Sequence, residues 1–377
     1  MKLTSIFRIF LALLLSVFFV ATAGAEIDAD SLVRQYDDGR TYVLSPSVDV
    51  SGTFNNDTMT VSAGTARDIV TSASTDVITF GSKGADSKIS DSRTEYSTGF
   101  QTLIPDGTMS IGYIQSDEND YHSKTVTAGA TREFFTKNTV VGFGFSNGND
   151  QILSSSNKAF DERMQNSVYS LSLSQILSKV SLIQILYDFR VENGYLASPY
   201  RRAKFDDGLG TPTSITAKDE NHPRTRNRNA FAVKYNHYLE NWATSFATTY
   251  RFYNDSWGVT SHTAEERVTK DLSSIWSVSL LFRYYMQSKA NFYQAYYTDT
   301  AAVFYSGNNT LATYHSFLIG LRPTYTLNDR VSFYLKLEAY EENFSDAVDA
   351  YSLSTKTDDK PLAISAKVIG LGVSARF

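Results

Sequence analysis

The feature of this sequence that most restricts its fold is a regular alternation of apolar and polar residues over long segments. In 276–287, the positions Trp276, Val278, Leu280, Phe282, Tyr284 and Met286 alternate with Ser277, Ser279, Leu281, Arg283, Tyr285 and Gln287. The segments 181–191, 315–327 and 331–340 follow the same pattern. Because successive side chains of a β-strand point to opposite faces, each segment is predicted to be a strand with one apolar and one polar face.

The length of these segments separates two kinds of β-protein. Strands of soluble sandwiches are typically about 5–6 residues long, whereas a tilted strand that spans a membrane needs about 9–11 residues. The segments here reach ten residues or more, and short turns such as Asn328-Asp329 alternate with long connections such as 193–225 and 288–312. This arrangement predicts an all-β fold, a transmembrane antiparallel β-barrel with short turns at one end and longer loops at the other.

The number of strands follows from a count made backwards from the C-terminus. Fifteen segments are found, and the stretch 29–37 supplies a sixteenth. The segments are 29–37, 41–53, 58–72, 92–104, 108–117, 122–136, 138–148, 165–176, 179–192, 226–239, 242–254, 257–270, 273–287, 313–327, 330–342 and 363–377. An even number is expected when both chain ends lie on one side of the membrane. Fourteen strands remain possible if the first two segments stay outside the barrel, and 295–306 could add a hairpin strand within a loop.

The composition agrees with a barrel and not with a helical membrane protein. Mean hydropathy is -0.26, which is too polar for helical spans, but a barrel needs apolar residues only on its lipid-facing half. The 24 Tyr and 24 Phe are expected where strands meet the membrane interfaces. The residues expected in these aromatic belts are Tyr250, Phe252, Tyr253, Trp257, Trp276, Tyr284, Tyr285 and Tyr325.

Charge and cysteine content exclude several functions. The chain has no cysteine, so thiolate metal sites, disulfides and cysteine nucleophiles are excluded. A net charge of -5 gives no electrostatic reason to expect nucleic acid as a partner.

Both ends of the sequence carry signals of export. The basic residues Lys2 and Arg8 precede the apolar run 9–20. Ala23-Gly24-Ala25 follows this run as a small-residue cleavage site. We therefore predict a signal peptide at 1–25 and a barrel domain at 26–377. The alternative, a retained membrane anchor, is disfavoured because the run is shorter than the ~20 residues of a spanning helix.

The C-terminus resembles the last strand by which barrel proteins are recognised for assembly. Ile369, Leu371, Val373 and Ala375 alternate before the terminal Phe377. The predicted location is the outer membrane of a Gram-negative bacterium. The expected partners are outer-membrane lipid and the barrel-assembly machinery, with a periplasmic or surface protein as a further possibility.

A family resemblance rests on the segment Phe282-Arg283-Tyr284-Tyr285-Met286-Gln287-Ser288 with the Asn291-Phe292-Tyr293 that follows it. It resembles the RYYxQSxAxFY signature of a family of uncharacterised proteobacterial outer-membrane proteins, classed as a domain of unknown function. The stretches 36–39, 75–79, 112–121 and 142–150 are also similar to that family. The resemblance implies a barrel and carries no substrate or catalytic residue.

The polar faces of the strands hold the first candidate site. The candidate pore-lining residues are Asp188, Arg190, Lys234, Arg251, Arg283, Arg322, Lys336 and Glu338. In a wide barrel, such a set lines a water-filled pore and sets its ion preference. Because cations outnumber anions in this set, weak anion selectivity is predicted if the pore is open. The alternative is that these residues form salt bridges that merely fill the lumen.

Two long loops hold the second candidate site. The segment 193–225 contains Arg201 and Arg202, and 289–306 is rich in aromatic residues. Candidates for a constriction or for ligand contact are Arg201, Arg202, Phe292, Tyr293, Tyr296 and Tyr297. A long loop can fold inward as a constriction or bind ligands outside the barrel, or its aromatic residues can simply extend the strands above the membrane.

Little in the sequence indicates catalysis. None of the five histidines is paired at metal-binding spacing, and Asn236-His237 is the best candidate for an active site at the barrel rim. The run from Asp117 to Asp120 has oxygen ligands suited to calcium, but a solvated acidic turn is the simpler interpretation. No catalytic residue, metal or cofactor is predicted.

The sequence therefore favours a porin-like channel or transporter for small polar solutes. The second hypothesis is a closed structural or partner-binding barrel that anchors a periplasmic or surface complex. A hydrolase with its site at the rim is the third.

Overall fold

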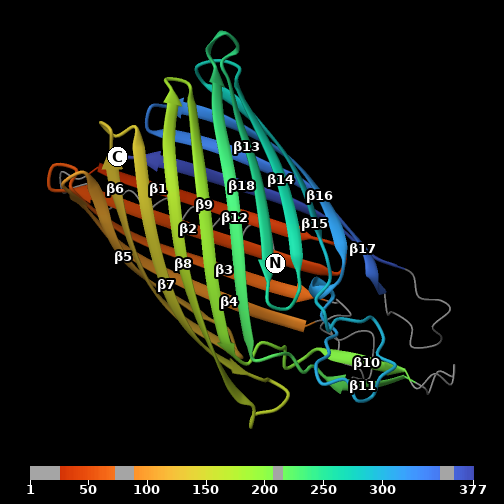
Figure 1. The fold of residues 1–377 in the computed structure, drawn as a ribbon. Helices are drawn as coiled ribbons and strands as arrows, with labels where there is room; N and C mark the ends of the chain where they lie inside the picture. Colours follow the sequence, from red (N-terminus) through yellow and green to blue (C-terminus); the bar gives the residue numbers. More distant parts are fainter. Residues whose placement is uncertain (1–25, 73–88, 207–214, 349–360) are drawn as a thin grey trace.

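The computed structural model describes residues 26–72, 89–206, 215–348 and 361–377, which form a closed antiparallel β-barrel (Figure 1). Its strands are β1 (Glu26–Asp37), β2 (Thr41–Phe54), β3 (Met59–Ser72), β4 (Ile89–Ile104), β5 (Gly107–Asp117), β6 (Tyr121–Phe134), β7 (Thr139–Leu153), β8 (Asp161–Ser178), β9 (Ser181–Gly194), β12 (Thr225–Leu239), β13 (Thr244–Asp255), β14 (Thr260–Asp271), β15 (Trp276–Gln287), β16 (Tyr314–Asn328), β17 (Val331–Val348) and β18 (Pro361–Arg376). Each strand pairs with its neighbours in sequence, and β9 pairs with β12.

The intervening strands β10 (Arg202–Asp206) and β11 (Ile215–Asp219) form a separate two-stranded hairpin beyond one end of the barrel (Figure 1). This hairpin lies within the long connection that follows β9. The segment 295–306, considered as an extra strand, forms only isolated bridges, Phe205 with Tyr297 and Asn221 with Tyr305. The prediction of a hairpin within a loop therefore named the wrong loop.

The barrel closes between the first and last strands. β1 pairs with β18 from Asp28 opposite Arg376 to Asp37 opposite Lys367. Beyond that ladder, the Ile27 N–H donates to the Phe377 carbonyl (2.9 Å) and the Phe377 N–H donates to the Ile27 carbonyl (2.8 Å). The prediction of sixteen strands is confirmed, because both N-terminal segments belong to the wall. The predicted signal peptide, 1–25, lies outside the described residues.

The two ends of the barrel differ. One end, called the turn end, holds Glu26, Phe377 and only short connections. The other, called the loop end, holds the long connections together with the short ones at 38–40, 118–120 and 256–259. Tight turns at the turn end use left-handed backbone at residues that tolerate it, as at Asn55 (φ 55°), Asn56 (φ 53°) and Asp106 (φ 54°). Asparagine and aspartate therefore set the turns at 55–58 and 105–106, whereas the turn at 135–138 has left-handed backbone at Phe135, Thr136 and Lys137.

The outer surface is apolar along most strands. Ile111 is 63% exposed, Leu371 58% and Phe282 52%, so these side chains lie on the outer face and not in a core. Residues opposite one another on paired strands share a face, and the registers carry this alternation around the barrel. Among the described residues, no helix is long and apolar enough to cross a bilayer.

The aromatic belts were predicted only in part. Tyr250, Trp276 and Tyr284 are exposed on the outer face as expected. Tyr253 instead donates to Asp255 and Tyr285 donates to Gln287, both on the opposite face of their strands. Trp257 is 5% exposed and packs in a cluster of loop residues, because the turn between β13 and β14 is covered by other loops.

Candidate functional site

The inner face of the barrel carries the predicted charged set. Arg283 lies opposite Glu265 on β14 and Leu318 on β16, and its neighbour Phe282 faces outward. The same reasoning places the whole set on the inner face, since each member alternates with an exposed apolar or aromatic side chain on its strand. The set is Asp188, Arg190, Lys234, Arg251, Arg283, Arg322, Lys336 and Glu338.

Several of these charges form ion pairs and yet remain in contact with water. Arg283 lies 2.7 Å from Glu265, Lys336 lies 3.0 Å from Glu338, and Arg190 lies 3.7 Å from Glu192. The side chain of Arg283 is 44% exposed and that of Arg190 is 41% exposed. A close-packed core would bury such charged side chains, so the inner face around them is not close-packed.

The lumen contains further charges that the sequence analysis did not select. They include Asp30, Arg34, Asp49, Asp68, Asp91, Arg93, Glu95, Glu192, Arg226, Arg228, Asp255, Glu265 and Arg267. The acidic members gather on β1 to β4, where Arg93 pairs with Asp68 at 3.0 Å. Period-two alternation could in principle have identified the acidic residues of β1 to β4. The outer faces of these strands are only weakly apolar, however, so the contrast between their two faces is small in the sequence.

A hollow of about 450 Å³ lies in the lumen wall near the loop end and is lined by Arg34, Asp68, Asp91, Arg93 and Glu118, among others. Beside it, oxygens of Asp91, Glu118 and Asp120 lie within 4.8 Å of one another. Two of these residues belong to the acidic run noted in the sequence, and the third comes from β4. The group makes this side of the loop end strongly acidic.

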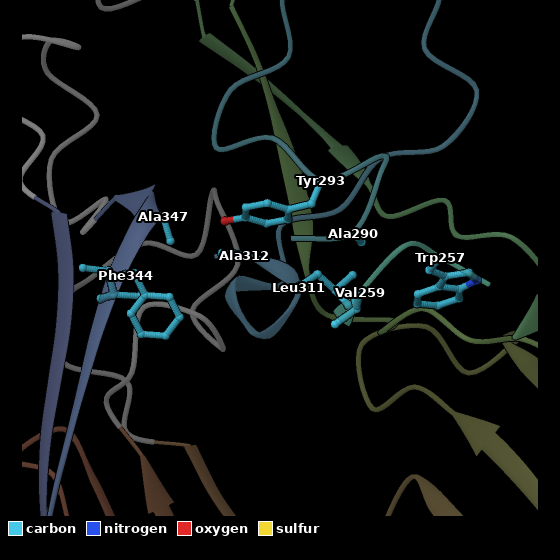
Figure 2. Close-up of a cluster of buried hydrophobic side chains, with 9 residues drawn as sticks. Trp257, Val259, Ala290, Tyr293, Leu311, Ala312, Phe344 and Ala347 are labelled. Atoms are coloured by element: carbon cyan, nitrogen blue, oxygen red, sulfur yellow. The ribbon is translucent and has the colours of Figure 1, made fainter. Parts of the chain in front are cut away.

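The long connections form an ordered assembly over the loop end. We call it the loop cover and define it as residues 195–206, 215–224, 256–259 and 288–313. Its larger apolar cluster also includes residues from the ends of β17 and β18 (Figure 2), with members Trp257, Val259, Ala290, Tyr293, Leu311, Ala312, Phe344, Ala347 and Leu362. A smaller cluster joins Ala203 and Phe205 of the hairpin to Tyr297. Apolar and aromatic packing therefore holds the connections β9–β12, β13–β14 and β15–β16 together, and joins them to the ends of β17 and β18.

A buried carboxylate lies at the centre of the loop cover. Glu220, whose side chain is 0% exposed, accepts hydrogen bonds from Ser306 Oγ (2.7 Å) and from the backbone N–H groups of Gly307 (2.8 Å) and Ser198 (3.1 Å). His222 Nε2 lies 3.7 Å from it, and His222 Nδ1 lies 2.8 Å from the Leu196 carbonyl oxygen. Burial alone would raise the pKa of Glu220, but these donors and the imidazole hold it below its ordinary value.

The family-like signature positions the loop cover. Gln287 Nε2 donates to the carbonyls of Thr310 (2.9 Å) and Ala312 (2.7 Å), and Tyr285 donates to Gln287 Oε1 (2.6 Å). The Asn291 N–H donates to the Trp257 carbonyl (2.8 Å). The signature therefore fixes where the connection after β15 returns to the wall.

The predicted loop residues belong mostly to the interior of the loop cover. Tyr293 is 2% exposed and Tyr297 is 1% exposed, and Phe292 packs against His222 and Trp257. Arg202 pairs with Asp219 across the hairpin at 3.1 Å. Arg201 contributes its carbonyl to the Glu220 N–H, and Tyr296 lies 5.2 Å from Lys204 Nζ. These groups hold the cover together, so ligand contact at Tyr293 or Tyr297 would require it to open.

The family described as "Protein of unknown function (DUF3570)" matches residues 31–357 of this sequence. The chain belongs to this family. The match confirms the family resemblance found in the sequence. The description of the DUF3570 family names no substrate. None of the curated proteins compared matches the sequence.

Solved structures similar to the DUF3570 chain are outer-membrane proteins. One is described as a bacterial polysaccharide outer membrane secretin, with TM-score 0.51, 9% identity and coverage of 93% of this chain and 98% of that one. Another is CdiB from Acinetobacter baumannii, with TM-score 0.51, 9% identity and coverage of 93% of this chain and 60% of that one. At this identity the likeness concerns the fold alone, an outer-membrane β-barrel.

Proposed function

We propose that the protein is a porin-like channel through which small polar solutes diffuse across the outer membrane of a Gram-negative bacterium. The observation that carries the proposal is the set of charged, water-exposed side chains at mid-height on the inner face, such as Arg283 and Arg267, whose side chains are 44% and 42% exposed. A barrel of this strand number is wide enough for an aqueous channel.

The orientation follows from the ends of the barrel. Glu26, Phe377 and the rest of the turn end would face the periplasm, and the loop cover would face outward. The C-terminal strand ending at Phe377 would be the segment that the assembly machinery recognises. Lipid would contact the exposed apolar band, which includes Ile111 and Leu371.

The loop cover favours a second candidate, a barrel that binds a partner at the cell surface. Its ordered clusters give the loop end a fixed surface, which suits recognition as well as partial closure of a channel.

No residue is proposed for hydrolysis at the rim: His237 lies 3.4 Å from the Tyr235 hydroxyl on the outer face, away from the lumen.

Single-channel recording in planar bilayers tests the proposal. We expect stepwise conductance from the purified, folded protein, and larger steps from Tyr297→Ala, which removes a ring that is central to the loop cover. A matched control is Tyr235→Ala on the outer face. Folded protein that inserts but gives no conductance, with or without Tyr297→Ala, would favour the closed partner-binding barrel.

A further inference from the structure

Six cationic side chains form an arc on one half of the lumen wall. They are Lys234 (β12), Arg251 (β13), Arg267 (β14), Arg283 (β15), Arg322 (β16) and Lys336 (β17). Each belongs to a different one of six consecutive neighbouring strands. Each also lies at least four residues from either end of its strand, so the arc is in the central part of the barrel. We call these residues the cationic arc.

Only part of the arc is neutralised by nearby carboxylates. Glu265 lies 2.7 Å from Arg283 and 3.6 Å from Arg267, and Glu338 lies 3.0 Å from Lys336. Within the described part of the chain, Lys234, Arg251 and Arg322 have no carboxylate within ion-pair distance. These three side chains leave net positive charge on this half of the lumen wall.

Arg322 is held in place without an anion. Its guanidinium carbon lies 4.0 Å from the centre of the Tyr334 ring, a cation–π contact. Its Nε is buried and has no hydrogen-bond partner in the described structure. Arg251 similarly lies 5.6 Å from the Tyr253 ring. Ring contacts position these guanidinium groups without a carboxylate partner, so their charge remains available to an oxyanion in the lumen.

The half of the wall that faces the arc carries very small side chains. In the closed order of strands, β3 to β8 lie across the lumen from β12 to β17, separated from them by β9 on one side and by β18, β1 and β2 on the other. Toward the turn end, glycines and hydroxyl residues predominate on their inner faces, whereas Asp68, Arg93 and Glu95 lie nearer the loop end of β3 and β4. A Cβ at Gly99 would lie 2.6 Å from Ser62 Oγ, and one at Gly112 would lie 2.7 Å from Thr127 Oγ1.

These short side chains leave room in the lumen opposite the arc. Serine and threonine hydroxyls on this wall can also donate hydrogen bonds to a passing anion without adding charge. Among other groups at the same height, Asp188 accepts from Ser170 (2.6 Å), and Asp30 and Asp49 lie in the gap between the two half-walls. On the facing wall, Asp68 pairs with Arg93 at 3.0 Å, and Glu95 lies beside them on β4. The path with least repulsion for an anion therefore follows the arc.

From this geometry we infer that the channel prefers small solutes bearing carboxylate or phosphate groups, and that Lys234, Arg251 and Arg322 determine this preference. Rows of arginine and lysine that line a water-filled lumen concentrate anions by their field and exchange hydrogen bonds with them. The inference rests on the proposed channel function and adds to it the class of solute and the residues that select it.

Reversal potentials in a KCl gradient test the inference, and citrate added on one side serves as the oxyanion probe. For the wild type we expect greater chloride than potassium permeability and a reduction of chloride current by citrate. The triple variant Lys234→Gln, Arg251→Gln, Arg322→Gln should lose both properties while still conducting. A control that removes the same charge outside the lumen is Arg132→Gln, Lys137→Gln, Lys179→Gln at the turn end, which should behave as the wild type.

The outcomes separate the two proposals. Absence of conductance from folded wild type would refute the channel itself. If the wild type conducts but prefers cations, the inference is overturned and the channel proposal stands. The same follows if the triple variant keeps the selectivity and the citrate block of the wild type. If the triple variant does not fold, the single variant Lys234→Glu replaces it. This substitution reverses one charge of the arc, so it should still shift the reversal potential toward the equilibrium potential of potassium.

Discussion

At the scale of single residues, the barrel wall separates two adjacent glutamates. Glu265 faces the lumen and pairs with Arg283, whereas Glu266 lies opposite Thr248 and Phe282 on the outer face. Thr248 Oγ1 donates to Glu266 Oε2 at 2.5 Å, and Glu266 Oε1 has no hydrogen-bond partner in the described structure. A half-satisfied carboxyl group facing lipid is unfavourable, although less so than a basic group there.

We therefore expect Glu266→Leu to stabilise the barrel in lipid vesicles by about 1 kcal/mol. Urea unfolding followed by tryptophan fluorescence measures the change. Glu265→Leu is the adjacent control, and it should destabilise because it leaves Arg283 unpaired. Destabilisation by Glu266→Leu would contradict the placement of this residue against lipid.

At the scale of elements, the connection between β15 and β16 is fixed by one amide. Gln287 is 8% exposed and makes both of its N–H donations to carbonyls of that connection. Replacing it with leucine would leave two carbonyls unsatisfied, a loss of about 1–3 kcal/mol for each buried group. The barrel ladder of β15 does not depend on these bonds.

Gln287→Leu should consequently loosen the loop cover while the barrel stays folded. Limited proteolysis should cut within 288–313 faster than in the wild type, with unchanged mobility of the unboiled protein on a gel. Gln184→Leu, a lumenal glutamine bonded to Ser174, is a matched control that should leave cleavage unaltered. Equal cleavage rates for Gln287→Leu and wild type would refute the role given to this amide.

The Glu220 carboxylate gives the loop cover a pH dependence. The pKa of Glu220 is lowered in the folded cover, so its contribution is fully present above the ordinary glutamate pKa of about 4.3. It is lost as pH falls through the lower folded value. We expect Trp257, which packs beside His222, to change its fluorescence below about pH 4 as the cover loosens.

Glu220→Gln provides the comparison, since it should remove this acid transition and leave a weaker cover at neutral pH. Trp242 and Trp276 lie elsewhere and contribute a background to the signal. Substituting both with phenylalanine isolates the emission of Trp257. An acid transition that persists in Glu220→Gln would assign it to another group.

At the scale of the whole molecule, closure depends on the two chain ends. Backbone hydrogen bonds between Ile27 and Phe377 extend the β1–β18 ladder to the last residue. Deletion of Phe377 removes these two bonds from a long ladder, so refolding into detergent should be nearly normal. If Phe377 is also the signal for assembly, the amount of folded protein in the outer membrane should fall strongly.

Heat-dependent gel mobility of membrane fractions and of refolded protein measures the two effects. Phe377→Tyr retains the aromatic terminus and should assemble like the wild type. Equal losses in cells and in detergent would mean that Phe377 acts only through stability.

The sequence by itself determined the barrel, favoured sixteen strands over fourteen, and set the face of the charged side chains that it singled out. These features follow from period-two alternation and turn residues, which are local along the chain. The outer or inner face of Arg283 is therefore already set by its neighbours Phe282 and Tyr284.

Only the tertiary structure decided which groups meet. The opposition of the cationic arc to the glycine and serine wall depends on the closed order of strands, which no single segment contains. The contact of Glu220 with Ser306 joins positions far apart in sequence, and the burial of Trp257 and Tyr297 comes from loops packing on loops. Such contacts depend on shape complementarity between irregular segments, for which the sequence has no periodic signal.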